Sequence, residues 1–227
     1  MELTPQDCLS ATPFIDVEHP DVAAYAQRVV GTASSDIDKA VRLYYAVRDD
    51  IRYDPYAIDL SINGLRASTV LQRGHGWCVN KAVLLAAVCR AAGIPAALGY
   101  ADVRNHLSTE RLRQTMQTDV FHHHGYTAIH LNGQWVKATP AFNLSLCEKF
   151  NLQPLEFDGR EDSIYHPFDL SGNQHMEYVA FRGEYADVPF SDIMQTFKTH
   201  YPNMERLDQA DFEQDVAQET HTPTLAG

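Results

Sequence analysis

The sequence predicts an α+β fold in which a buried helix carrying a cysteine packs on an antiparallel β-sheet, with extra helices at both ends of the chain. The first observation is an apolar helix, from about Cys78 to Ala92, that directly follows a glycine-rich turn. The second is a β-hairpin around Asn132-Gly133, a strong short-range turn signal. The third is amphipathic helical periodicity on either side of these two features.

The composition is that of an ordinary globular protein, which we expect to form a single domain over residues 1–227. Of the 227 residues, 44% are hydrophobic and 21% are charged, and the sequence contains no repeat, low-complexity segment or linker. The formal net charge of −12 argues against nucleic acid and against an anionic membrane surface as partners.

Nothing in the sequence predicts export or membrane insertion. No apolar run is long enough to cross a bilayer, and residues 1–7 lack the basic and apolar regions of a signal peptide. The four cysteines form no CxxC pair and no metal-ligand spacing. These observations predict a cytoplasmic protein with free thiols, and they leave the oligomeric state open.

Two helices and a helical turn are expected before the central helix. The first helix spans residues 22–30, and the second begins after Ser34 or Ser35 and carries one apolar face as far as Ile51. Residues 57–67 are expected to form a loop that turns at Asn63-Gly64, and residues 67–73 a short helical turn.

After the central helix the chain predicts strands first and helices later. Gly93 and Pro95 end the helix, and residues 96–101 follow as a buried strand. Residues 102–120 are expected to be a long excursion, with a helix at 110–117, that could cover a site. The remaining expectations are hairpin strands at 125–131 and 134–139, a strand and turn at 155–159, a strand at 178–183, helices at 190–200 and 208–218, and a polar tail.

Cys78 is the leading candidate for chemistry because it lies where a helix begins. Unpaired N–H groups and the dipole at a helix N-terminus stabilise a thiolate relative to a thiol. Gly74 and Gly76 allow a sharp turn and the close approach of a ligand. The alternative is a structural cysteine, since free cysteines are among the most buried residues.

A catalytic cysteine needs a base, and the run His122-His123-His124 at the start of the hairpin offers three imidazoles. In a regular strand His122 and His124 face one side and His123 the other, so spacing alone does not choose among them. His75 and His106 are alternative bases.

A metal site is the other possible use of these histidines. His122 and His124 could bind a transition metal together with His106 or His130. No carboxylate or cysteine pair completes a ligand set at helical spacing, so we expect neither a metal nor a cofactor.

Two groups of motifs resemble the core of the transglutaminase-like superfamily of cysteine enzymes, over about residues 35–145. The stretch Gly76-Trp77-Cys78, a helix of small residues and the exit Arg90-Ala91-Ala92-Gly93-Ile94-Pro95 are similar to the family's cysteine turn and helix. The stretch His124-Gly125-Tyr126 and the later Asn132-Gly133-Gln134-Trp135-Val136 resemble its histidine strand, tight turn and tryptophan strand. The resemblance implies a papain-like/transglutaminase-like core in a small member of bacterial type.

The resemblance also implies a catalytic triad of cysteine, histidine and aspartate, which by position falls on Cys78, His124 and Thr139. Thr139 departs from the family's aspartate, because a hydroxyl can orient an imidazole but adds no charge. Asn143, through its side-chain carbonyl, and Asp158 are alternatives for the orienting role.

The reaction that the resemblance implies is acyl transfer. His124 would hold Cys78 as a thiolate that attacks an amide or thioester carbonyl, while the Cys78 N–H, with Trp77 or Asn63, stabilises the oxyanion. Water or an amine then resolves the thioacyl enzyme, and we expect hydrolysis of an amide bond in a peptide, a protein or a small amide. The alternative, motivated by Thr139, is a non-catalytic binding or scaffold domain of the same fold.

Overall fold

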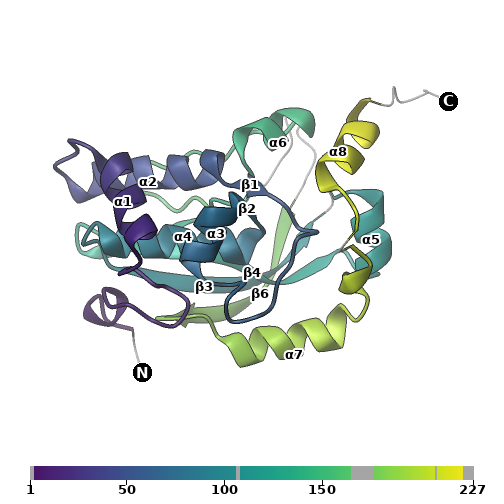
Figure 1. The fold of residues 1–227 in the computed structure, drawn as a ribbon, viewed down its shortest axis with the longest axis horizontal. Coiled ribbons are helices and arrows are strands. Elements are labelled where there is room, and N and C mark those ends of the chain that lie inside the picture. The colour runs from purple at the N-terminus through teal and green to yellow at the C-terminus, as the bar shows by residue number, and fades with distance from the viewer. Residues whose placement is uncertain (1–2, 106–107, 165–175, 208, 222–227) are drawn as a thin grey trace.

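The computed structural model describes residues 3–105, 108–164, 176–207 and 209–221, and it has the expected α+β architecture. Figure 1 shows helices α1–α4 gathered over one face of the main sheet, with α7 on the opposite side and α5 and α8 at one end. A large cluster of buried apolar side chains lies between the sheet and α4. No helix in the described ranges is long and apolar enough to cross a membrane.

The N-terminal segment forms a 3-10 turn, η1 (Gln6–Cys8), and two helices, α1 (Pro20–Val30) and α2 (Asp36–Asp50). The α1 helix begins at a proline, whose missing N–H costs nothing in the first turn, and ends at Gly31. The α2 helix is capped by Ser35, whose Oγ accepts the Asp38 N–H at 3.1 Å. Both predicted helices are therefore confirmed, and Ser35 is the cap.

The segment that precedes the cysteine consists of short elements. Strand β1 (Arg52–Tyr53) pairs in parallel with β2 (His75–Gly76), and α3 (Ala67–Arg73) lies between them in the sequence. Gly74 ends α3 at φ 69°, a left-handed conformation that favours glycine. The chain then enters α4 (Cys78–Ala91), which contacts α1, α2 and α3 as well as the sheet. Because helices and the sheet cover α4 on several sides, α4 is apolar on nearly all sides.

The main sheet has the strand order β5-β4-β3-β6, and all of its pairs are antiparallel. Its strands are β3 (Ala96–Asn105), β4 (Val120–Leu131), β5 (Gln134–Ala138) and β6 (Met176–Tyr185). Asn132 and Gly133 both have positive φ, as a two-residue type I′ hairpin requires. The hairpin prediction is confirmed, and β3 and β4 are longer than the sequence indicated.

The remaining elements are α5 (Glu110–Met116), α6 (Leu144–Lys149), α7 (Phe190–His200), η2 (Met204–Leu207) and α8 (Phe212–His221). The predicted helices at 110–117 and 190–200 are confirmed. The last helix was expected at 208–218 and instead begins at Phe212.

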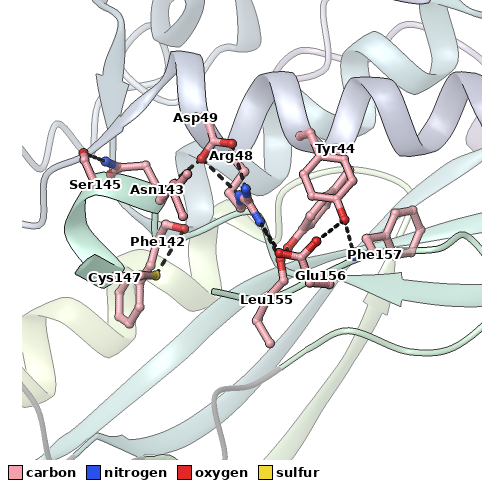
Figure 2. Close-up of polar contacts among 12 residues, drawn as sticks. Tyr44, Arg48, Asp49, Phe142, Asn143, Ser145, Cys147, Leu155, Glu156 and Phe157 are labelled. Carbon is pink, nitrogen blue, oxygen red and sulfur yellow. Dashed lines mark hydrogen bonds and ion pairs between the residues drawn. The ribbon is translucent and has the colours of Figure 1, made fainter. Parts of the chain in front are cut away.

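The strand expected at 155–159 is wrong. The Leu155 carbonyl accepts hydrogen bonds from Tyr44 at 3.0 Å and from Arg48 at 2.8 Å, both on α2 (Figure 2). A carbonyl oxygen accepts two hydrogen bonds, and α2 side chains supply both here, so this carbonyl is not available to a strand ladder. Further along this segment, Ser163 forms a bridge to Ala138 of β5.

Candidate active site

Cys78 is the first residue of α4, and its sulfur is surrounded by backbone donors. The backbone N–H groups of Gly125, Val79 and Cys78 act on the thiol as donors, and each lowers its pKa. Two of these groups belong to the first turn of α4, where backbone N–H groups lack helical partners. The third comes from β4. The sulfur therefore lies in a small cradle that suits a negative charge.

Burial works against this cradle. Cys78 is only 4% exposed. Its removal from water is the largest influence on the thiol, and it raises the pKa to about 11 despite the three N–H donors. The sequence indicated that the start of the helix stabilises a thiolate. In the structure, the start of the helix alone does not make Cys78 a thiolate at neutral pH. A proton acceptor close to the sulfur is needed for that.

A cavity opens beside the sulfur. Cys78 and Trp77 form one part of its wall. Strand β1 contributes Tyr53, and the start of β4 contributes His122. Among the described residues the Trp77 indole Nε1 is buried without a hydrogen-bond partner. The cavity wall therefore brings together a thiol, an imidazole and the indole ring of Trp77.

The three histidines lie at an irregularity of β4. Ala101 pairs with His124 but Val103 pairs with Phe121, so His122 and His123 together face Asp102. His123 has φ 54°, a left-handed conformation that is uncommon outside glycine. This is a β-bulge, and it removes the simple alternation that the sequence argument assumed for these side chains.

Asp102 connects the bulge to a neighbouring strand. Its carboxylate contacts His122 Nδ1 at 2.9 Å and accepts the His123 N–H at 3.1 Å. Arg182, on β6, donates to both carboxylate oxygens, at 3.0 and 2.5 Å. Burial alone would raise the pKa of Asp102, but the hydrogen bonds from Arg182, His122 and His123 lower it to about 2. Asp102 is therefore ionised, and the structure contains an imidazole–carboxylate pair at the cavity that holds Cys78.

His124 lies on β4 next to the cysteine cradle. It is 4% exposed, and it precedes Gly125, whose N–H reaches the sulfur. A Cβ at position 125 would come within 3.0 Å of the Val79 Cα, so glycine allows β4 to cross the start of α4 closely. The backbone directly after His124 is thus held against the start of α4.

The three candidates for orienting the histidine have other contacts. The Thr139 hydroxyl donates to the Ile164 carbonyl at 3.1 Å, so it can offer an imidazole only an acceptor. Asn143 accepts the Tyr53 N–H at 3.0 Å and donates to Ser145 at 2.7 Å, the latter seen in Figure 2. The Asp158 carboxylate is at the surface, where it accepts the N–H groups of residues 160 and 161.

The secondary candidates from the sequence do not line the cavity at the thiol or lie outside the described residues. His75 lies 3.9 Å from Asp54, and Asn63 is on an exposed loop. His106, an alternative base and metal ligand, lies outside the described residues. Within the described ranges, no group of three or more histidine, cysteine or carboxylate side chains is arranged to hold a metal ion.

The sequence analysis missed Asp102 and Arg182. Asp102 had been placed in an excursion, whereas β3 continues to Asn105. The alternation of Asp102, Val103 and Arg104 was a usable signal, because a buried valine between two polar residues is typical of a strand. No feature of the sequence pattern predicted the β-bulge at His123.

The fold and the site define a class: an α+β protein whose cysteine begins a buried helix against a histidine-bearing antiparallel strand. The family model of the transglutaminase-like superfamily matches residues 23–140, just over half of the chain. The chain therefore belongs to the transglutaminase-like superfamily. Among curated proteins none matches its sequence.

Two solved structures share parts of the fold at low identity. One is a protein of Cytophaga hutchinsonii, provisionally assigned as a cysteine protease, with 14% identity and a TM-score of 0.48 over 82% of this chain and 55% of the other. The second is a protein of Parabacteroides distasonis, provisionally assigned as a protease, with 16% identity and a TM-score of 0.39 over 54% of this chain and 24% of the other. The chain thus spans about half of the first protein and a quarter of the second.

Proposed function

We propose that this chain is a cysteine-dependent acyl-transfer enzyme that hydrolyses an amide or peptide bond through a thioacyl intermediate. The observation that carries the proposal is the environment of Cys78. Three backbone N–H groups act on its thiol. The thiol also lines a cavity beside a strand that carries histidines. A purely structural thiol requires neither converging donors nor access to a cavity. The substrate would be a peptide, a protein or a small amide.

His124 is the proposed base, because its position in the family pattern and its place beside Gly125 agree. The imidazole takes the Cys78 proton, and the thiolate forms a bond to the carbonyl carbon. The tetrahedral intermediate then collapses, the C–N bond breaks, and the leaving amine receives the proton from the imidazolium. Water, deprotonated by the same imidazole, attacks the thioester; the C–S bond breaks and the acid leaves. Thr139 remains the proposed orienting residue at the family's aspartate position.

The oxyanion would be stabilised at the start of α4. The backbone N–H of Cys78 belongs to the first helical turn, lacks a helical partner and acts next to the reacting sulfur. Trp77 lines the same cavity, and its buried indole N–H has no hydrogen-bond partner among the described residues. A cytoplasmic, reducing setting is part of the proposal, because all four cysteines are free.

The assignment of the base is tested by the pH dependence of Cys78 alkylation in His124→Ala and His122→Ala variants. With its proton acceptor removed, the thiol should titrate where burial places it, so the His124→Ala profile should move up toward a pKa of about 11. The His122→Ala profile should stay close to that of the unmodified protein. The reverse result would transfer the role of base to His122 and its Asp102 partner.

A further inference from the structure

The cavity beside Cys78 is apolar. Its aromatic walls come from Tyr53 on β1, Phe121 on β4 and Phe197 on α7, and α5 contributes the side chains of Leu112 and Met116. Apart from Cys78 and His122, the described residues that line it are all aromatic or aliphatic, including one proline. None of them carries a carboxylate, an ammonium or a guanidinium group.

A second apolar cavity continues from the first. The two share Tyr53, Pro55, Leu112 and Phe121 as walls. Beyond these shared residues the second cavity is bounded mainly by Phe142, Leu146, Phe150, Leu152 and Phe212. The space open to the centre of a water-sized molecule is about 20 Å³ in the second cavity and about 30 Å³ in the first, so both cavities are narrow.

The position of the sulfur indicates which part of a substrate would lie in this space. Once the leaving group has departed, the acyl group remains covalently attached to the Cys78 sulfur. Cys78 is only 4% exposed, so a group attached to it lies in the cavity rather than in solvent. An ionised group there would lose its hydration and meet one titratable side chain that can carry a positive charge, His122, which already pairs with the Asp102 carboxylate. An apolar group would replace contacts with water by contacts with aromatic walls.

We propose that the acyl group transferred to Cys78 is apolar and carries an aromatic or branched aliphatic side chain that packs against these walls. The proposal rests on the proposed function, because it assigns the substrate class of the same thiol. Under this proposal, the side chains that α5 and α7 contribute to the cavity wall determine which acyl groups react.

A matched series of thioesters tests the proposal. Each has the same N-acetylcysteamine leaving group, and the acyl groups are acetyl, 4-methylpentanoyl, 3-phenylpropanoyl and succinyl. The Cys78 thiolate forms a bond to the carbonyl carbon, the thioester C–S bond breaks, and the N-acetylcysteamine thiolate leaves with the electron pair and takes up a proton. Intact-mass spectrometry with peptide mapping follows the acylation of Cys78. The rate for each thioester is divided by its rate of reaction with glutathione, which corrects for differences in intrinsic reactivity. Iodoacetamide, small and neutral, reports the reactivity of the thiol itself.

The expected result is that 3-phenylpropanoyl and 4-methylpentanoyl acylate Cys78 at least about tenfold faster than acetyl or succinyl, since each added methylene in an apolar pocket contributes about that order. If iodoacetamide labels Cys78 but succinyl or acetyl reacts as fast as the apolar groups, the proposed specificity is wrong and the proposed function stands. If iodoacetamide does not label Cys78 in the folded protein, the proposed function fails and the specificity fails with it.

A substitution in the cavity wall gives the second test. Met116→Lys introduces an ammonium group on a side chain of similar length at a 5% exposed wall position, and it should raise the ratio of succinyl to 3-phenylpropanoyl rates. Met194→Lys, at a 38% exposed position of α7 outside the cavity, is the matched control and should leave the ratio unchanged. Met116→Ala, which adds no charge, should instead reduce the advantage of 3-phenylpropanoyl over acetyl. Unchanged ratios in both Met116 variants, with folding verified by circular dichroism, would overturn the proposal.

Discussion

At the scale of single residues, Asp102 is the group on which the geometry of the site depends. One carboxylate holds the His122 ring, the His123 backbone and the Arg182 guanidinium at once. A left-handed residue such as His123 persists in a strand only when its surroundings hold it there. Asp102 therefore fixes the bulge that precedes His124 and Gly125.

Replacing Asp102 by asparagine should destabilise the protein by about 2 kcal/mol at pH 6, because hydrogen bonds to a buried charge are lost. The folded pKa of Asp102 is about 2, below its ordinary value of 3.8. Its contribution is thus fully present above about pH 4 and is lost as the pH falls through 2. The difference in unfolding free energy between the parent and Asp102→Asn, measured by urea titration, should shrink between pH 4 and pH 2.

Asp119→Asn is the matched control, because Asp119 pairs with Arg104 at 3.1 Å but is 51% exposed. We expect it to cost less than about 1 kcal/mol. Equal costs for the two variants would show that Asp102 does not hold the bulge.

At the scale of elements, α4 carries the nucleophile and also anchors α2. Lys81 lies three residues after Cys78 and is completely buried. Its ammonium donates to the carbonyls of Arg48, at 2.9 Å, and of Ile51, at 2.5 Å, where α2 ends. A cation is favourable at a helix C-terminus, where carbonyl groups lack helical partners. The lysine thus joins the two helices directly behind the cysteine.

This anchor predicts an unusual pH dependence of stability. Burial is the main cause that lowers the pKa of Lys81 from 10.5 to about 7. Between those pH values the unfolded chain binds the proton more tightly than the folded chain, so the unfolding free energy should rise with pH. The slope from this one group is at most about 1.4 kcal/mol per pH unit.

The measurement is urea unfolding at pH 7, 8 and 9 for the parent protein and for Lys81→Met, which retains the side-chain length. The stability of the parent relative to Lys81→Met should increase across this range. Lys39→Met is the control: Lys39 forms a surface pair with Asp36, and its profile should run parallel to that of the parent. Parallel profiles for Lys81→Met as well would show that the buried lysine is not titrating in this range.

At the scale of the whole molecule, local signals in the sequence predicted the core of the fold. The cap at Ser35, the Gly93 stop and the Asn132-Gly133 turn each depend on residues adjacent in the chain, and the structure confirms all three elements. What the sequence could not provide depends on distant partners. The Arg182–Asp102 contact joins β6 to β3, and the raised pKa of Cys78 arises from side chains of several elements packed around it.

The same difference separates the parts of the site. Cys78 and His124 lie in recognisable local patterns, so the sequence could single them out. The apolar cavity is assembled from β1, α4, α5, β4 and α7, segments that are far apart in the chain, and no single stretch of sequence indicates it. The cavity therefore became visible only once the fold had brought its walls together.

The most direct test of the central claim is competitive alkylation of the four cysteines in the folded protein. Cys8, Cys89 and Cys147 are free, fully buried and outside the cavity, and burial raises the pKa of each. Sub-stoichiometric iodoacetamide at pH 7.5, followed by peptide mass spectrometry, measures the four rates together, and urea-unfolded protein serves as the reference. The account predicts that Cys78 reacts at least about tenfold faster than the other three in the folded protein, because only a thiol with a nearby proton acceptor forms a thiolate at that pH. Faster labelling of Cys8, Cys89 or Cys147, or a Cys78 that reacts only after unfolding, would contradict it and favour a non-catalytic domain of the same fold.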